Sequence, residues 1–231
     1  MVLTQRILFE DNHLIAINKL CGEIVQGDRT GDTPLVELVK AHLKERDGKQ
    51  GNVFAEVVHR IDRPVSGAIL FAKTSKVVPR MNKLFHNGEV QKQYWAVVGK
   101  QPPLDADTLV HHVTKNQKQN KTYIHNHPRE GSREARLSYQ LIGSSDRYFY
   151  LQVQLHTGRH HQIRAQLAGI GCPIKGDLKY GFPRSNPDGG IHLHSRSISF
   201  VHPVSNQSLC IVAPPPNDVL WNNFIPLSKI F

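Results

Sequence analysis

Residues 55–74 read AEVVHRIDRPVSGAILFAKT, and this stretch places a single carboxylate between two short apolar runs. The runs predict a strand, a loop and a second strand, with Asp62 on the loop. Arg60 and Arg63 flank it in a chain whose net charge is already +10. A surface carboxylate gains little from such neighbours, whereas one that must stay ionised away from water gains much. The pattern therefore makes Asp62 the first candidate for a functional residue.

Further strands and helices can be predicted on both sides of this loop from the spacing of apolar residues. The clearest helix lies within residues 32–48, where Pro34 suits the first position and Gly48 follows the end. The other elements, in chain order, are a strand pair within 7–19, a helix from Ser75 to about 87–88, a strand at 90–99, a hairpin within 136–158, a short helix at 160–171, a hairpin within 191–216 and a helical turn at 219–224.

The expected fold class is α+β, because helices are interspersed with strands that are joined mostly by hairpins and are therefore antiparallel. We find no internal repeat. We expect a single domain over residues 1–231, with room for two packed subdomains. Residues 101–134 lose the apolar rhythm and become polar and basic, so they are predicted to be a partly flexible excursion; a hypervariable surface loop is the alternative.

The charge balance points to a polyanionic partner. Lys and Arg number 29 against 19 Asp and Glu, and the sequence pI is about 9.7. Such an excess favours nucleic acid through phosphate neutralisation, although a basic enzyme without that role is the alternative.

Apolar runs fall short of the roughly 20 residues that span a bilayer, and the first residues resemble no signal peptide. Three scattered cysteines fit reduced thiols, so we expect a cytoplasmic protein without membrane contact.

Fourteen histidines raise the question of a metal site. His192 and His194 would share one face of a strand, which would suit a binuclear or nuclease-like site. Zinc sites usually use CxxC or HExxH patterns, and neither occurs here, so hydrogen-bond partners or RNA contacts are the favoured interpretation. GxxxxGK[ST], GxGxxG and GxSxG are also absent from the sequence. We therefore expect no metal and no cofactor, and we expect Ser66 to be a turn residue rather than a nucleophile.

Three blocks, in this order, resemble the motifs of the RluA-type pseudouridine synthases: HRIDRPVSG at 59–67, KQYWAVVGK at 92–100 and LHTGRHHQIRAQLAGIGCPIKGDLKYG at 155–181. The segments INKLCGEIVQGD at 17–28 and IHLHSRSISFVHP at 191–203 resemble further blocks of that family, so that the resemblance runs from Ile7 to Val212. It implies a mostly antiparallel mixed sheet with flanking helices and a central cleft.

Four departures from the family pattern spare its charged groups. They are Leu20-Cys21 in place of the usual proline and its neighbour, Ile61 in place of Leu, Val65 in place of Thr, and His160 where Thr or Ser is common. We expect them to bear on substrate fit and not on chemistry. Since the first predicted strand begins close to Met1, we also expect no S4-type RNA-binding domain and an RNA affinity that comes from the catalytic domain itself.

The resemblance implies isomerisation of uridine within RNA, in which the glycosidic bond breaks, the uracil rotates, and C5 replaces N1 on C1′. It implies that Asp62 is the catalytic carboxylate and that Arg164 is its ion-pair partner, not an exposed helix arginine. At about 4 Å and an effective dielectric near 20, such a pair attracts by roughly 4 kcal/mol before desolvation is subtracted. For Tyr94 it implies a ring that stacks on uracil and a hydroxyl that assists proton removal at C5; a half-buried strand tyrosine is the alternative.

The base must leave its stack at a cost of a few kcal/mol, and the resemblance implies that Arg60 fills the vacated space or holds a phosphate. Lys92 shares a strand face with Tyr94 and is expected to contact RNA backbone, while Leu167 is expected to wall the pocket. For Arg63, a contact with phosphate and a solvated surface charge are equally favoured interpretations. Weaker predictions of phosphate contacts are Lys73, Arg159, His161 and Lys175.

The leading hypothesis is thus an RNA pseudouridine synthase that acts on tRNA or rRNA as a monomer. A catalytically inactive RNA-binding protein on the same scaffold is the alternative, against which the joint presence of Asp62, Tyr94 and Arg164 argues. A histidine- or metal-dependent ribonuclease is a third hypothesis. The target uridine cannot be read from the sequence, because RNA is recognised through shape and splayed bases.

Overall fold

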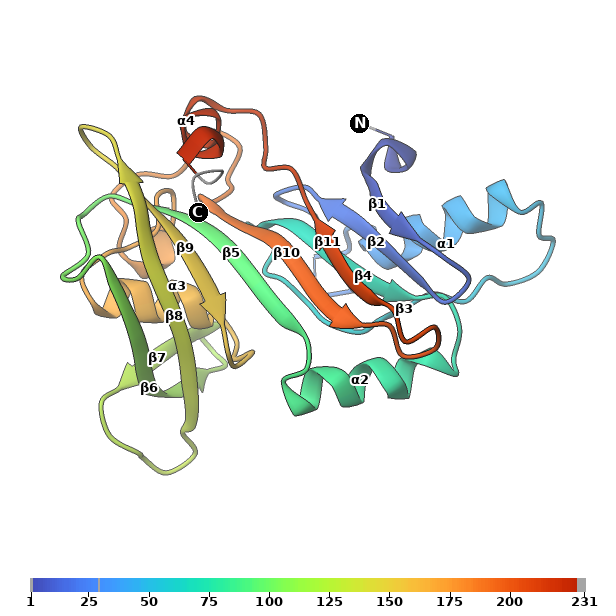
Figure 1. Cartoon of the computed structure of the whole chain (residues 1–231), viewed down its shortest axis with the longest axis horizontal. Helices are drawn as coiled ribbons and strands as arrows, with labels where there is room; N and C mark the ends of the chain where they lie inside the picture. The colour runs from blue at the N-terminus through green and yellow to red at the C-terminus, as the bar shows by residue number, and fades with distance from the viewer. Residues whose placement is uncertain (1, 29, 228–231) are drawn as a thin grey trace. The chain divides into compact units, whose positions relative to one another are not determined.

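The computed structural model describes residues 2–28 and 30–227, and the chain divides into two compact units. Unit 1 comprises Met1–Val90 and Ser195–Pro214, and unit 2 comprises Gln91–His194 and Pro215–Phe231. Each unit combines antiparallel strands with helices (Figure 1), so the predicted α+β class is confirmed. In the part of the chain that the structure describes, no helix is both long enough and apolar enough to cross a membrane.

Unit 1 contains the loop that carries Asp62. Its strands follow the order β1-β2-β4-β10-β11, and a short β3 pairs with β4. Their bounds are Ile7–Glu10 for β1, Leu14–Lys19 for β2, Glu56–Val57 for β3, Ser66–Ala72 for β4, Leu193–Val201 for β10 and Ser208–Val212 for β11. The helices are η1 at Leu3–Arg6, α1 at Leu35–Arg46 and α2 at Val77–Asn87. The predicted strands around Asp62 are confirmed, since the loop joins β3 to β4.

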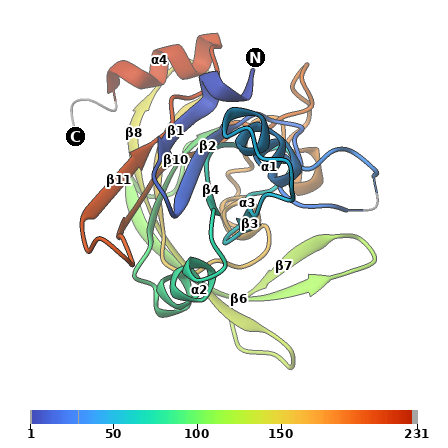
Figure 2. The ribbon, with the colours of Figure 1, turned by 90° about the vertical axis from the view of Figure 1, so that its right-hand side faces the viewer.

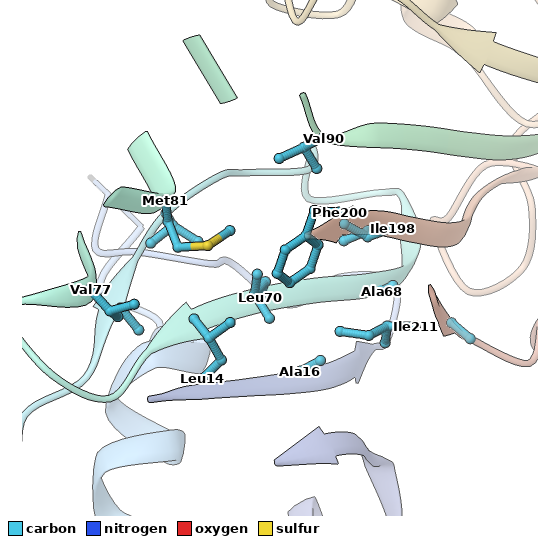
Figure 3. Packing of buried hydrophobic residues seen from close by; sticks show 13 residues of the cluster. Leu14, Ala16, Ala68, Leu70, Val77, Met81, Val90, Ile198, Phe200 and Ile211 are labelled. Carbon is cyan, nitrogen blue, oxygen red and sulfur yellow. The ribbon is translucent and has the colours of Figure 1, made fainter. Parts of the chain in front are cut away.

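The core of unit 1 forms where α2 packs against the strands (Figure 3). Val77 and Met81 of α2 belong to the same buried cluster as Leu14 of β2 and Leu70 of β4. Every residue of β4 is buried, so this strand has apolar neighbours on both faces. Burial of that kind stabilises by about 1.5–3 kcal/mol for each large aliphatic side chain. The strand that follows the Asp62 loop is therefore a rigid support for it.

Gly67, the second residue of β4, is required by a close approach to the neighbouring strand. Its φ is +114°, in the region that favours glycine, and a Cβ at this position would lie 2.3 Å from the backbone oxygen of Ser195. The Ser195 hydroxyl also donates to the carbonyl of Ala68 at 3.1 Å. The motif SG thus brings the two strands together immediately after the loop.

Replacing Gly67 with Ala is expected to lower the free energy of unfolding by at least about 3 kcal/mol, through the clash with Ser195 and through backbone strain. Urea unfolding measures it. Gly27→Ala is the matched control, because a Cβ there meets nothing within 4 Å, and it should change stability by less than about 0.5 kcal/mol. Equal stabilities of the two variants would show that the close approach is not maintained in solution.

Unit 2 is built on five antiparallel strands in the order β5-β9-β8-β6-β7. Their bounds are Gln91–Val98 for β5, Ala106–Asn116 for β6, Lys121–His125 for β7, Arg133–Ser144 for β8 and Phe149–Leu155 for β9. Its helices are α3 at Gln162–Gly169, η2 at Leu178–Tyr180 and α4 at Val219–Leu227. Trp221 and Phe224 of α4 pack on Trp95 and Val97 of β5. Gln166 of α3 donates to backbone carbonyls of β6 and β8.

Most predicted elements are confirmed, but the prediction of a partly flexible excursion at residues 101–134 is wrong, because this region forms strands. This region forms the hairpin of β6 and β7 (Figure 2), in which Asn116 pairs with Lys121 across a turn that ends at Asn120, φ +45°. Only Leu109 and Val113 of β6 are buried. The apolar residues of β6, namely Ala106, Leu109, Val110 and Val113, do not alternate regularly with polar ones, so the periodicity of the sequence could not reveal this strand. A smaller difference is that Pro34 occupies the N-cap of α1 and not its first helical position.

Candidate functional site

Asp62 lies half-buried on the loop between β3 and β4, in a turn where its carbonyl accepts the N–H of Val65 at 3.0 Å. The flanking side chains of Arg60 and Arg63 are exposed. Arg63 Nη2 lies 2.7 Å from Asp32 Oδ2 in an ion pair with both side chains about half exposed. Such a pair contributes little to stability, so a phosphate could replace Asp32 at small cost. Both predicted roles of Arg63 stay open.

Lys19 fixes this loop through hydrogen bonds to its backbone carbonyls. It is the last residue of β2 and is fully buried, and its Nζ donates to the carbonyls of Leu20 at 2.9 Å, Arg63 at 3.0 Å and Val65 at 2.8 Å. The N–H of Gly22 also donates to the carbonyl of Arg63, at 2.9 Å. The backbone on the C-terminal side of Asp62 is therefore fixed by three hydrogen bonds from residues 19–22.

Burial lowers the pKa of Lys19 to about 8, while the negative charges of Glu23 and Asp62 act in the opposite direction. The protonation state matters because an ammonium has three N–H donors, one for each of its three carbonyl partners. A neutral amine has two. Lys19 can therefore donate to all three carbonyls only in its charged state, which the neighbouring carboxylates favour.

His59 fixes the other side of the loop. Its Nε2 accepts the backbone N–H of Leu70 at 3.0 Å, so this nitrogen carries no proton, and its ring packs on Phe85 at 5.0 Å. The loop is consequently anchored to β4 at its beginning and to β2 at its end. That arrangement gives Asp62 a defined backbone position, which a catalytic carboxylate needs.

In unit 2, Arg164 projects from α3 and is 4% exposed. Its Nε donates to Asp177 Oδ2 at 2.7 Å and its Nη2 to Asp177 Oδ1 at 2.9 Å. Its guanidinium also lies over the ring of Tyr180, 5.1 Å from the centroid. Two parallel bonds to one carboxylate fix the plane of a guanidinium, so Arg164 is a rigid, buried cation. The pairing of Arg164 with Asp62 stays a prediction.

A hydrogen-bond network joins α3 to the β6–β7 hairpin. The hydroxyl of Tyr180 accepts the backbone N–H of Thr122 at 2.8 Å and lies 3.0 Å from Nδ1 of His161. The Thr122 hydroxyl donates to the carbonyl of His160 at 2.8 Å. His161 occupies the N-cap of α3 with φ +49°. Burial lowers the pKa of His161 to about 2, and the charge of Arg164 adds to this effect.

His161 is therefore neutral at physiological pH, and its predicted phosphate contact stays a prediction. The lowered pKa also makes the folded state sensitive to acid. The folded pKa of about 2 lies below the ordinary 6.5, so the unfolded chain binds the extra proton and stability falls as the pH drops below about 6.5.

Between pH 7 and pH 5, the wild type is expected to lose about 2 kcal/mol more of its unfolding free energy than His161→Asn, which tolerates the positive φ and does not titrate there. Urea unfolding at the two pH values measures the difference. Equal losses in both proteins would show that His161 protonates normally in the folded state.

Tyr94 and Lys92 alternate with Gln93 along β5 and point to the face opposite Trp95. Tyr94 is 6% exposed, and Lys92 is half-buried, with its pKa lowered by burial. A Cβ on Gly158 would lie 3.4 Å from Lys92 Nζ, so the lysine reaches the loop before α3. The prediction that Lys92 and Tyr94 share a strand face is confirmed, whereas their contacts with RNA stay predictions.

The remaining predicted site residues are buried or have hydrogen-bond or ion-pair partners within the chain. Leu167 is fully buried in α3, and Arg159 donates through Nε to the carbonyl of Glu134 at 2.9 Å. Lys175 donates to Asn186 at 2.7 Å, and Lys73 pairs with Glu10. Unit 1 thus brings Arg60, Asp62 and Arg63 onto one loop, and unit 2 holds the other predicted site residues, namely Lys92, Tyr94, Arg159, His161, Arg164 and Leu167.

Two residues with central places in these networks have no role in the sequence analysis. Lys19 ends the strand LIAINK, whose first four residues are apolar, and a charge at the end of such a run is a signal for a buried partner. Asp177 is the one acid in the basic stretch KGDLK, which likewise signals a specific pairing. Among the described residues, no three His, Cys, Asp or Glu side chains are grouped so that they could hold a metal ion.

Comparison with known proteins gives consistent results. The family model described as RNA pseudouridylate synthase matches residues 13–169. An uncharacterized RNA pseudouridine synthase of Synechocystis is 31% identical over 91% of this chain and 65% of its own length. The ribosomal large subunit pseudouridine synthase D of Xylella fastidiosa is 32% identical over 92% of this chain and 66% of its length. The chain thus spans about two thirds of these two relatives.

One further relative matches over nearly its whole length. The tRNA pseudouridine synthase C of Haemophilus influenzae is 31% identical, over 90% of this chain and 91% of the relative. Among solved structures, human RNA pseudouridylate synthase domain containing 4 superposes with a TM-score of 0.78 at 22% identity, over 98% of this chain and 94% of the other. That likeness concerns the fold.

Proposed function

The chain belongs to the RNA pseudouridylate synthase family, and on that premise we propose that it isomerises uridine to pseudouridine within RNA. The observation that carries the proposal is the loop at residues 59–67. It lies within the matched family region and holds one carboxylate, Asp62, on a backbone that Lys19 and His59 fix from both sides. A rigidly held carboxylate suits a reaction in which a glycosidic bond is broken and re-formed at carbon.

In the proposed reaction, Asp62 acts as an anion on the sugar or base of the bound uridine. Arg164 keeps the carboxylate ionised, because a nearby guanidinium offsets the desolvation that would otherwise favour protonation. The bidentate bond to Asp177 supports this role, since it holds the guanidinium plane in one orientation. Tyr94 is proposed to stack on the uracil ring and to assist proton removal at C5.

The base reaches these groups only after it leaves its stack, which costs a few kcal/mol. Arg60 is proposed to occupy the vacated space, and its exposed position on the Asp62 loop supports this role. Arg63 is proposed to exchange its exposed partner Asp32 for a phosphate. Lys92 and Arg159 are proposed as further contacts to the RNA backbone.

The substrate is proposed to be tRNA or rRNA. Relatives named for each kind of RNA match this chain at similar identity, so their names do not choose between the two. The net charge of +10 favours binding to phosphates. Exposed basic side chains on the β6–β7 hairpin, on the loop that follows it and at the start of β8 would add to it: Lys115, Lys118, Arg129, Arg133 and Arg136. We further propose a monomer that works in the cytoplasm.

The test uses RNA transcripts labelled with tritium at C5 of uridine, because formation of pseudouridine releases that label. Release by the wild-type protein supports the proposal, and carbodiimide-sensitive stops in RNA from cells with and without the protein locate the uridine. RNA binding without release would instead indicate a catalytically inactive RNA-binding protein. Binding should also weaken steeply as salt rises; a flat response would place the basic charge away from the RNA.

A further inference from the structure

The segment that holds the Asp62 loop is itself held by a second ion pair. Glu23 Oε2 accepts hydrogen bonds from the backbone N–H of Leu20 at 2.8 Å and from Nη1 of Arg6 at 2.7 Å. Arg6 is the last residue of η1 and is 5% exposed. A single carboxylate oxygen therefore joins the N-terminal 3-10 helix to the turn that follows Lys19.

This turn carries the donors that reach the loop. The bond from Leu20 to Glu23 closes it, and within it Gly22, at φ +84°, directs its N–H to the carbonyl of Arg63. Lys19 immediately precedes it and donates to the same carbonyl. A shift of the turn would thus disturb both donors of Arg63 together. The closure depends on the residue at position 20 having an N–H, which leucine supplies and proline would lack.

Stability alone does not account for the pair. Removing a guanidinium from water costs several kcal/mol, and apolar side chains often serve equally well at such places. Arg6 also keeps a buried Nε that has no hydrogen-bond partner among the described residues, which is a further cost. An arginine at this position is better explained by the need to hold Glu23 in one place.

The charge of Glu23 has a second effect on the same structure. It opposes the burial that lowers the pKa of Lys19, and so favours the ammonium with its three donors. Glu23 therefore supports the loop in two ways, through the shape of the turn and through the protonation state of Lys19.

We propose that Arg6 and Glu23 are positioning residues, which act through Lys19 and Gly22 on the backbone of residues 62–65 and thereby set the place of the Asp62 carboxylate. The proposal rests on the catalytic role proposed for Asp62. Neither residue needs to touch RNA. Their loss should therefore slow the chemical step more than it weakens binding.

Glu23→Gln tests this, because glutamine keeps an acceptor for Leu20 and removes the charge. It is expected to lower kcat for tritium release about tenfold to a hundredfold, the effect of a misplacement of about 1 Å, with KM for RNA changed less than about twofold. The alkaline limb of the kcat profile should move to lower pH, because Lys19 loses its proton more easily. Glu37→Gln, in the exposed pair with Lys40, is the matched control and should leave kcat and the profile unchanged.

Two variants of Arg6 settle the question if Glu23→Gln folds poorly. Arg6→Met should lower kcat as Glu23→Gln does, and Arg6→Lys, which keeps a positive charge, should lie closer to wild type. The proposal is overturned if Arg6→Lys is no better than Arg6→Met, or if Glu23→Gln folds and matches Glu37→Gln in kcat. Failure of the proposed function would differ: the wild type would release no label, or Asp62→Asn would remain active.

Discussion

Asp62→Asn is expected to reduce tritium release from C5-labelled RNA by at least about a thousandfold, the upper part of the range for loss of one acid–base or nucleophilic group. Asparagine has nearly the same size and can occupy the same place on the loop, but its neutral amide cannot act as an anion on the uridine. The loop contacts involve the backbone at residues 63 and 65 and the His59 ring, so they should persist.

The control for this variant is Asp146→Asn, an exposed carboxylate in the turn between β8 and β9. It should release label at the wild-type rate. RNA affinity, measured at one salt concentration, should stay within about twofold in both variants. If Asp62→Asn retained a tenth or more of the activity, the catalytic role of Asp62 would be wrong.

Arg164→Met is expected to have two large effects. Asp177 is 1% exposed, and removal of its guanidinium partner leaves a buried carboxylate unpaired, so stability should fall by about 3–5 kcal/mol. Activity should fall with it, because the proposed partner of Asp62 is lost. Urea unfolding measures the first effect and tritium release measures the second.

A double variant separates these effects. Adding Asp177→Asn to Arg164→Met removes the stranded charge, so it should recover much of the lost stability without restoring activity. The single variant Asp177→Asn keeps the guanidinium and should retain more activity than Arg164→Met. If the double variant regained activity along with stability, Arg164 would serve the fold of unit 2 alone.

The fold could be predicted wherever burial leaves a trace in the spacing of apolar residues. β4 contains the unbroken apolar run AILFA because both of its faces are buried. α2 shows apolar residues at helical spacing because one face packs on the strands. The hairpin of β6 and β7 leaves no such trace. Its strands are held by backbone pairing and by a few contacts such as Thr122 with His160, and these have no periodic signature in the sequence.

The sequence likewise predicts one part of the candidate site and misses another. Asp62 could be identified from its motif, but the hydrogen bonds of Lys19 to backbone carbonyls of the loop, 44 and 46 residues away in sequence, follow from the pairing of β2 with β4. Asp177 as the partner of Arg164 depends on how the chain returns after α3. Motifs indicate candidate reacting groups, whereas the groups that orient them depend on tertiary contacts.

The central claim is that an ionised Asp62, paired with Arg164, faces an extruded uridine. A crystal structure of the protein bound to a substrate RNA tests it most directly. The expected result is a carboxylate oxygen of Asp62 within about 4 Å of an Arg164 guanidinium nitrogen, with a flipped uridine against both and its ring on Tyr94. The account is contradicted if the two side chains lie more than about 10 Å apart, beyond the reach of screened charges, or if the flipped base binds elsewhere.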